Sequence, residues 1–378
     1  MDRTIIDKIL HRLLCLKWHR ELDCHYKKVL KINNIVNSNK EKENLWLQKW
    51  GGYKVPISPL QYRVFRKYIG DDINIVPEEV IHLVIEPVLN SKMAAGFYGD
   101  KNFFEKILPP SYLPKTILRK IRGQFYDKDY KRIDLNKSYI EGIINGVNTK
   151  KLIIKPSVDG ESGRGVYLFN FSDTDNCWES NNKTLTTGYL QEEQGDDIII
   201  QEAIEQHADI AQFNSSSVNT LRLAVYRSIK DDQCHIIGAI MRIGTHGSVV
   251  DNAHQGGCFV GINKNGKLKH TVCNQYGQMS QGFNGIDFNK DFYYPEWYSV
   301  TSFAKDICRR IVHHRLVALD IVVDITGTPK LIEYNVTPGT FSSWLFQYTI
   351  GPLFGDYTDE ILEYCKLIGS KAPLYKLK

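Results

Sequence analysis

The spacing of hydrophobic residues divides the chain into a helical first part and a strand-rich remainder. Across residues 1–95, apolar side chains recur mostly at intervals of three and four, which predicts a helical N-terminal lobe. Helical patterns continue in DKNFFEKIL (100–108) and NKSYIEGII (136–144), with a loop around Pro109 and Pro110 between them. We therefore expect helices rather than strands up to about residue 144.

The first predicted helix carries a stripe of apolar residues beside several basic ones. Its members lie at helical spacing in the run IIDKILHRLLCLKWHR: Ile6, Ile9, Leu10, Leu13 and Leu14. Such a stripe most often packs on the protein's own core, which is the interpretation we favour. A helix that rests on a membrane surface is the alternative, because basic residues flank the stripe.

After Lys150 the pattern changes to short apolar runs bounded by turn residues, which indicates strands. The runs are KLIIKP (151–156), GVYLF (165–169), DIIIQEAI (197–204), TLRLAVYRSI (220–229), CHIIGAIMRIG (234–244), LVALDIVVD (316–324) and PKLIEYNV (329–336). The polar residues 230–233 and the Thr-Gly-Thr turn at 326–328 predict two hairpins, and helices are expected at 297–314 and 358–368. Antiparallel strands mixed with helices favour an α+β fold over a doubly wound sheet.

The composition is that of a globular protein with a sizeable core, since 42% of the 378 residues are apolar. No run reaches the roughly 18–20 uninterrupted apolar residues of a membrane span. The cysteines include no CxxC pair and the N-terminus has no signal stretch, so we predict a soluble or peripheral cytoplasmic protein with reduced thiols. The net charge of +5 suits anionic ligands such as nucleotides, whereas no basic tract indicates nucleic acid. GxSxG and thiol-enzyme motifs are absent, which disfavours a covalent hydrolase.

Three oxygen-bearing side chains mark the last predicted hairpin. Glu333 and Asn335 are two residues apart, so they leave the same face of one strand, and the turn near Gly327 brings Asp320 alongside them. Mg²⁺ prefers a few protein oxygens together with phosphate oxygens, so this set is a candidate metal site. Solvated acidic residues on an exposed strand face are an equally weighted alternative.

A lysine and a glycine-rich loop follow the first predicted strand. Lys155 ends KLIIKP, and the loop after it contains Gly160, Ser162, Gly163 and Gly165. Such a loop can bring backbone N–H groups to phosphates, while the lysine supplies a point charge. The loop matches neither a P-loop nor a Rossmann fingerprint, and a flexible hairpin connection is the alternative.

The run DIIIQEAIEQHADI leads from a predicted buried strand into a polar stretch. A strand that enters a linker between lobes can present backbone groups to a nucleotide base. Glu202, Glu205 or Asp209 then lies within reach of ribose hydroxyls.

Two arginines lie on adjacent predicted strands and precede a glycine-containing loop. Arg222 and Arg242 can hold a carboxylate or a transferring phosphoryl group, or they can be surface charges. Asn252, Gly256 and Gly257 form a tight loop by composition, which makes them candidate substrate contacts.

Taken in chain order, these motifs resemble the ATP-grasp superfamily and, more narrowly, the sugar-transfer-associated ATP-grasp proteins, which are related to alanine–alanine and glutamate ligases. The resemblance spans about residues 90–350. Its most specific parts are SVNTLR (217–222), the DN-x3-GG loop (251–257) and D-x12-E-x-N-x2-PG (320–339). It implies an ATP-grasp fold with two α+β lobes that clasp the nucleotide (96–204 and 205–378) after a helical lobe (1–95).

The resemblance also implies roles for individual residues. Lys101 and Lys155 would contact the nucleotide phosphates, and the loop from Gly160 to Gly165 would close over them. The remaining implied roles are adenine contacts at Gln201, Glu202 and Ile204, a ribose contact at Asp209, Mg²⁺ ligation by Asp320, Glu333 and Asn335, and stabilisation of the γ-phosphate and acyl phosphate by Arg222 and Arg242.

The implied reaction is ATP-dependent, Mg²⁺-requiring joining of a small-molecule carboxylate to an amine through an acyl phosphate, with release of ADP. The family's association with sugar transfer suggests a sugar acid, amino acid or amine of a bacterial surface polysaccharide or capsule. A kinase that phosphorylates a hydroxyl or sugar, and a nucleotide-binding scaffold in polysaccharide assembly, are the alternatives.

Overall fold

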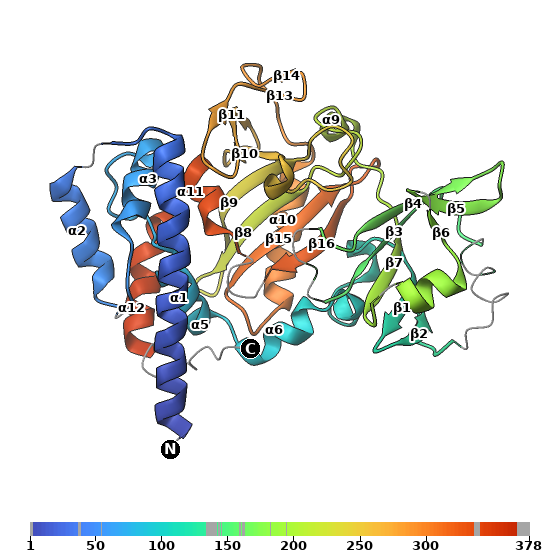
Figure 1. The fold of residues 1–378 in the computed structure, drawn as a ribbon, viewed down its shortest axis with the longest axis horizontal. Helices are drawn as coiled ribbons and strands as arrows, with labels where there is room; N and C mark the ends of the chain where they lie inside the picture. Colours follow the sequence, from blue (N-terminus) through green and yellow to red (C-terminus); the bar gives the residue numbers. More distant parts are fainter. Residues whose placement is uncertain are drawn as a thin grey trace.

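A computed structural model describes residues 3–36, 39–53, 55–133, 142, 144, 146–158, 160, 163–181, 183–193, 195–335 and 341–368. The chain begins with helices, as predicted (Figure 1). These are α1 (Arg3–Ile32), α2 (Lys40–Gly51), α3 (Pro59–Ile69), α4 (Glu78–Val80), η1 (Ile81–Ile85), α5 (Glu86–Leu89) and α6 (Lys92–Gly99). Asn39 and Ser58 begin α2 and α3 by accepting hydrogen bonds from the backbone N–H groups of Lys42 and Leu60.

The second half of the chain forms an antiparallel sheet of seven described strands, here called the C-terminal sheet. Its order is β12 (Met279–Ser280), β11 (Leu268–Cys273), β10 (Cys258–Ile262), β9 (Cys234–Ile243), β8 (Leu221–Arg227), β15 (Leu316–Val323) and β16 (Pro329–Asn335). Both predicted hairpins, β8–β9 and β15–β16, are confirmed. The helices that accompany it are α9 (Ala208–Ala211), η5 (Ala253–Gln255), α10 (Trp297–Arg310), α11 (Ser343–Thr349), η6 (Gly355–Tyr357) and α12 (Thr358–Ile368), beside a small hairpin of β13 (Gly282–Phe283) and β14 (Ile286–Asp287).

A second antiparallel sheet of seven described strands, here called the N-terminal sheet, precedes it in sequence. Its order is β2 (Gln124–Asp127), β1 (Thr116–Ile121), β7 (Ile198–Glu202), β3 (Lys151–Pro156), β4 (Tyr167–Ser172), β5 (Cys177–Ser180) and β6 (Lys183–Thr184). Short helices flank it: η2 (Lys101–Phe103), α7 (Phe104–Ile107), η3 (Pro110–Tyr112) and η4 (Tyr189–Glu193).

The prediction of helix throughout 100–144 is wrong at β1 and β2, which form a hairpin. Arg119 and Lys120 are buried in β1, so charged residues interrupt the apolar alternation that would have indicated a strand. The turn is made by Arg122 and Gly123, both at positive φ, as a two-residue hairpin turn requires. Helix is confirmed at Phe104–Ile107, whereas most of 136–144 lies outside the described residues.

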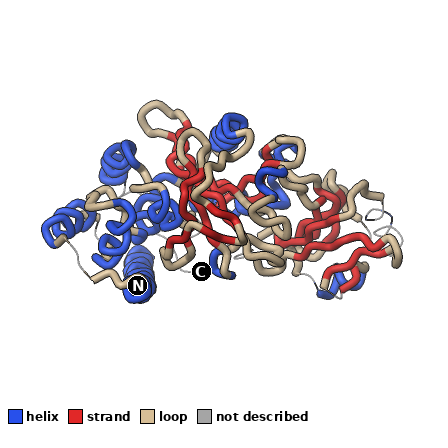
Figure 2. The backbone as a smooth tube through the Cα atoms, turned by 90° about the horizontal axis from the view of Figure 1, so that it is seen from above, coloured by secondary structure: helices blue, strands red, loops and turns tan. Residues whose placement is uncertain are grey.

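The C-terminal sheet separates two apolar cores. One face packs against the N-terminal helices together with α11 and α12, where the rings of Phe65 and Tyr348 lie 5.0 Å apart. The other face is covered by α10 and α6. The N-terminal sheet has its own core, which includes Leu152, Phe169 and Leu190. Figure 2 shows the helices at one end of the molecule, the C-terminal sheet in the middle and the N-terminal sheet at the other end.

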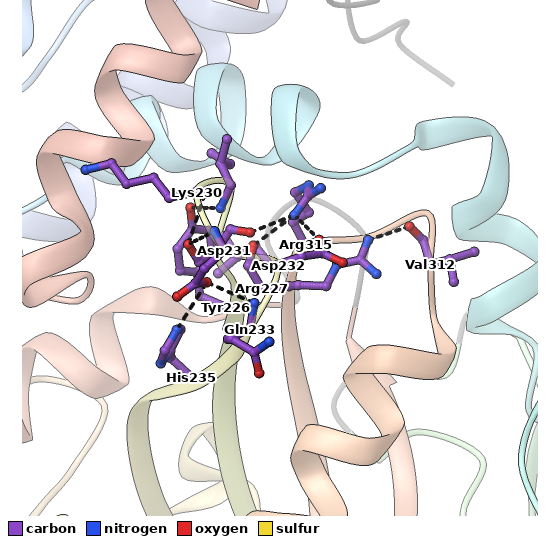
Figure 3. Close-up of polar contacts among 12 residues, drawn as sticks. Tyr226, Arg227, Lys230, Asp231, Asp232, Gln233, His235, Val312 and Arg315 are labelled. Carbon is purple, nitrogen blue, oxygen red and sulfur yellow. Dashed lines mark hydrogen bonds and ion pairs between the residues drawn. The ribbon is translucent and has the colours of Figure 1, made fainter.

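A polar cluster fixes the turn between β8 and β9 (Figure 3). Arg227 donates to the Val312 carbonyl (2.6 Å), and Arg315, which immediately precedes β15, donates to Asp232 in the turn (2.8 Å). Glu360 of α12 accepts from the Tyr226 hydroxyl and from the Ile229 N–H, at 2.7 Å each. These contacts fix the C-terminal end of β8 and its register. The register in turn sets the position of Arg222 near the beginning of the same strand.

The apolar stripe predicted on α1 is partly packed on the protein core and partly exposed to solvent. Leu14 packs on the core of the helical lobe, beside Cys15 and Trp18, whereas Ile9 and Leu13 are exposed. The favoured prediction of a core-packed stripe therefore holds for only part of it. Among the described helices, none is both long and apolar enough to cross a membrane.

Candidate active site

The two sheets enclose a cavity of about 720 Å³. Lys155 and Gln201 line it from the N-terminal sheet, and Arg242 and Glu333 line it from the C-terminal sheet. The predicted site residues found in its wall are Lys101, Lys155, Gly160, Gly163, Gln201, Glu202, Ile204, Arg222, Arg242, Asn252, Glu333 and Asn335. Residues that lie more than 200 positions apart in the sequence thus line the same cavity.

Strand register explains how the charged residues come together. On β15, Asp320 pairs with Arg222 of β8 on one side and with Glu333 of β16 on the other. Arg242 lies on β9, the next strand beyond β8. Asn335 follows Glu333 by two positions, so both leave the same face of β16.

The centre of the charged cluster is Asp320, which is buried. Both of its carboxylate oxygens accept hydrogen bonds from Arg222, from Nε and Nη2, at 2.7 Å each. Arg242 Nη2 also lies 3.2 Å from Asp320 Oδ2. Burial by itself would raise the pKa of the Asp320 carboxyl, but the two guanidinium groups outweigh it and lower the pKa. Asp320 is therefore an anion held between two cations.

A second buried carboxylate, Asp251, fixes Arg242 from the other side. Arg242 Nη2 lies 3.2 Å from Asp251 Oδ1, and the Thr220 backbone N–H donates to Asp251 Oδ2 at 2.8 Å. Burial would lower the pKa of Arg242, but Asp251, Asp320 and Glu333 together raise it. The candidate site residues from the sequence did not include Asp251, although it is the first letter of the DN-x3-GG motif.

The two lysines lie at the other side of the same cluster. Lys101 Nζ forms an ion pair with Glu333 Oε1 at 2.9 Å. Burial first, and then the positive charge of Lys101, lower the pKa of the Lys155 ammonium to about 7. Two buried lysines beside one carboxylate suit an anion such as phosphate, because a bound anion favours the charged form of the Lys155 amine.

The glycine-rich loop connects β3 and β4 and approaches Val250, in the loop that follows β9 of the C-terminal sheet. Gly163 has φ +73°, and a Cβ on it would lie 2.8 Å from Val250 Cγ1. Gly160 lines the cavity, whereas Gly165 does not and instead packs against Pro156. Ser162 lies outside the described residues. Gly163 and Val250 both line the cavity, so the loop meets the opposite lobe within the cavity wall.

The end of β7 forms the wall where adenine contacts were predicted. Gln201 is buried and donates to the Pro114 carbonyl (3.2 Å), and Glu202 pairs with Lys115 (2.8 Å). Glu205 lines the cavity, but Asp209 does not. Asp209 lies in α9 with an exposed side chain, because the chain turns into this helix soon after β7. The structure therefore does not bring Asp209 together with the other site residues.

The end of the cavity near β10 and α11 contains aromatic residues. Trp344 of α11 lines it beside His254, with their ring centroids 6.2 Å apart. Asn252 also lines it, and its side-chain oxygen accepts the His254 N–H (3.1 Å). Gly256 and Gly257 form the turn behind this wall without lining it, and a Cβ on Gly257 would lie 2.8 Å from the Ile243 carbonyl oxygen.

The three predicted metal ligands differ in whether their side chains line the cavity. Glu333 and Asn335 line the cavity with oxygen-bearing side chains, which fits Mg²⁺ ligation completed by phosphate oxygens. Asp320 lies outside the cavity lining, and both of its oxygens are held by Arg222. Within the described ranges no group of three His, Cys, Asp or Glu side chains could hold a metal by itself.

Two antiparallel sheets that close on a cavity of lysines, a glycine loop and a carboxylate–arginine cluster define the ATP-grasp fold, the fold of a class of ATP-dependent ligases. The model of the sugar-transfer associated ATP-grasp family matches residues 85–348, more than half of the chain. The chain belongs to this family. The predicted resemblance is confirmed, and the α+β, ATP-grasp fold class with it.

Several solved structures resemble this fold at low sequence identity. D-alanine–D-alanine ligase from Bacillus anthracis matches at 14% identity over 75% of this chain and 72% of its own, with a TM-score of 0.38. VanG D-Ala:D-Ser ligase from Enterococcus faecalis matches at 14% identity over 74% and 64%, with a TM-score of 0.42. The ATP-grasp ligase PsnB, solved with Mg and ADP, matches at 13% identity over 73% and 61%, with a TM-score of 0.37. No curated protein matches the chain in sequence.

Proposed function

We propose that this protein is an ATP-dependent ligase that activates a carboxylate as an acyl phosphate and joins it to an amine, forming a C–N bond and releasing ADP and phosphate. The observation that carries the proposal is that lysines, a carboxylate and an arginine from both sheets line one cavity. Lys101 pairs with Glu333, and Lys155 lines the same cavity. Arg242 is held by Asp320 and by Asp251, which directly precedes Asn252 in the chain. A triphosphate on the lysines would thus present its terminal phosphate to the arginines.

The reaction transfers the γ-phosphoryl group to a carboxylate oxygen, and the bond from phosphorus to the ADP oxygen breaks. Most of the catalysis in such a transfer comes from positioning and from neutralising charge on the phosphoryl oxygens. Lys101 and Lys155 would hold the ATP phosphates, and Arg242 would meet the transferred group. Mg²⁺, held by Glu333 and Asn335, would neutralise phosphate charge when bound.

In the second step the amine nitrogen attacks the acyl carbon, the bond from that carbon to the phosphate oxygen breaks, and the amine loses a proton. Water must be excluded until then, because it would hydrolyse the acyl phosphate. The contact of Gly163 with Val250 supports the loop 160–165 as the lid that excludes it. Residues 162–164 stay the predicted lid residues, and Ser162 among them lies outside the described residues.

The nucleotide base would lie against the end of β7, where Gln201, Glu202 and Ile204 line the cavity. Glu205, one of the candidates from the sequence, lines the cavity and is our choice for the ribose contact in place of Asp209. A carboxylate that faces the cavity can accept hydrogen bonds from ribose hydroxyls.

The aromatic end of the cavity supports a substrate with an apolar ring face. Trp344, with His254 and Asn252 beside it, can stack on a sugar ring and hydrogen-bond its hydroxyls. We therefore place a sugar acid, or an amino acid or amine joined to one, at this end, in the synthesis of a bacterial surface polysaccharide or capsule. All eight cysteines are free thiols, as a reducing compartment requires, and we assign the enzyme to the cytoplasm.

The direct test is Mg²⁺-dependent ADP release with pooled uronic acids and amino acids, in the presence of hydroxylamine. Formation of a hydroxamate together with ADP is the expected result, because hydroxylamine captures an acyl phosphate. A stable phosphoester on a hydroxyl would instead establish a kinase. ATP binding without turnover of any pooled acid would favour a nucleotide-binding scaffold.

The ring-stacking assignment has its own test. Trp344→Ala is expected to raise the KM for the carbohydrate substrate with little change in the KM for ATP, and Trp344→Phe should restore most of the affinity. Equal effects on both KM values would contradict a stacking role at that end of the cavity.

A further inference from the structure

The N-terminal half of α1 exposes four large apolar side chains on one side. Ile6, Ile9, Leu13 and Leu16 are 37%, 47%, 53% and 47% exposed. Their spacing of three, four and three residues places them in one stripe about 15 Å long along the helix. We name this stripe of four residues the apolar face of α1.

The opposite side of the same helix already has its partners. Cys15, Tyr26 and Val29 are buried in the core of the helical lobe, with Trp18 and Leu22 packed beside them. The apolar face therefore points away from the protein. Figure 1 also shows the first turns of α1 extending past the other helices of the lobe.

Basic residues surround and continue the apolar face. Lys8, Arg12 and Arg20 are exposed, and Arg20 continues the same side of the helix beyond Leu16. Residues 1–32 contain eight lysines and arginines and four acidic residues, so this segment accounts for most of the net charge of +5. A surface that is apolar in the middle and basic at its edges matches an anionic lipid bilayer in both respects.

From this arrangement we infer that α1 is a membrane-surface anchor, which lies with its apolar face in the headgroup region of an anionic bilayer. The charge distribution favours a bilayer over a second copy of the chain, because two copies of α1 would bring like charges together. Four apolar residues provide reversible, peripheral binding, strengthened by Arg12 and Arg20. The inference is independent of the proposed reaction, since α1 does not line the cavity.

The test uses the full chain in co-sedimentation with vesicles of phosphatidylcholine alone and of an equal mixture of phosphatidylcholine and phosphatidylglycerol. Binding is expected on the mixed vesicles and not on the neutral ones, and salt should weaken it. The double variant Ile9→Ser/Leu13→Ser is expected to bind at least about tenfold more weakly. Arg12→Gln/Arg20→Gln should weaken binding by about tenfold or more on the mixed vesicles.

The matched control is Val312→Ser/Leu367→Ser, which removes two exposed apolar side chains elsewhere and should leave binding unchanged. Because the substituted residues are exposed, thermal unfolding of each variant should match that of the original protein. Failure to bind mixed vesicles would overturn the inference, as would equal binding to neutral vesicles. A dimer in light scattering that dissociates in Ile9→Ser/Leu13→Ser, without vesicle binding, would assign the face to a second copy instead.

Discussion

Arg222 and Asp320 face each other across β8 and β15 and are joined by two hydrogen bonds of 2.7 Å each. Both side chains are buried, so Arg222 without Asp320 would be a buried cation that has lost its carboxylate, whereas Asp320 without Arg222 would keep only Arg242 at 3.2 Å. Asp320→Asn removes the negative charge at nearly constant shape and should lower the free energy of unfolding by about 3–5 kcal/mol. Denaturant unfolding measures this change.

The control for this pair is a double-mutant cycle with Arg222→Met. The double variant should be more stable than the sum of the two single losses predicts, because no charge of the pair is then left unpaired. Additive losses would show that Arg222 and Asp320 do not interact as the structure indicates.

Asp251 should act through Arg242 rather than on the substrate. Asp251→Asn retains an oxygen for the Thr220 N–H but weakens the hold on Arg242, and a misplaced arginine can cost up to about 100-fold in turnover. We expect kcat to fall while the Kd for ATP stays nearly constant. A matched Asp→Asn change at the exposed Asp287 should leave both values unchanged, and equal losses in the two variants would contradict the positioning role.

Lys155 should couple nucleotide binding to proton uptake. Its folded-state pKa of about 7 lies below the ordinary value of 10.5, so above pH 7 the unliganded site holds mostly neutral lysine. A bound phosphate favours the charged form, and ATP affinity should therefore fall as pH rises above 7, by up to about tenfold per unit. The unfolded chain keeps this proton up to pH 10.5, so the same group makes stability rise with pH over that interval.

Calorimetric titration with ATP in buffers of different ionisation enthalpy measures the proton uptake. Lys155→Met should lose it along with much of the affinity, which separates the lysine from the titration of ATP itself. Identical proton uptake in the original protein and in Lys155→Met would contradict the assignment.

Gly163 offers a test of the lid. Gly163→Ala places a Cβ against Val250, whereas Gly247→Ala, at a similar positive φ, meets no atom within 4 Å. Both variants carry the backbone cost of a left-handed alanine, about 1–2 kcal/mol. A greater loss of turnover in Gly163→Ala, partly restored by Val250→Ala, is expected if the loop closes on Val250. Equal losses would show that the contact has no part in catalysis.

The sequence predicted the parts of the fold that have simple patterns. The β8–β9 and β15–β16 hairpins are long apolar runs with clear turns, and the terminal helix at 358–368 has helical spacing. Strand β1 has no such pattern, because its buried Arg119 depends on Glu105, a partner that only the folded chain brings near.

Some residues of the candidate site could likewise be predicted from the sequence, and others could not. Residues inside ordered motifs, such as Lys155 and Glu333, could be found because several weak signals occur in family order. Trp344 and His254 are single residues on short helices, and no periodicity marks them as a cavity wall. Asp209 was chosen by position in the chain, and the turn into α9 takes it away from the cavity.

The central claim is that a carboxylate oxygen attacks the γ-phosphate of ATP. Once a substrate acid is found, the decisive measurement is mass analysis of the inorganic phosphate released during amide formation from acid labelled with ¹⁸O in its carboxylate. The account predicts that one labelled oxygen moves from the carboxylate to each phosphate, because the acyl carbon loses that oxygen when the amine attacks. Phosphate without label, or label retained in a phosphorylated product, would contradict it.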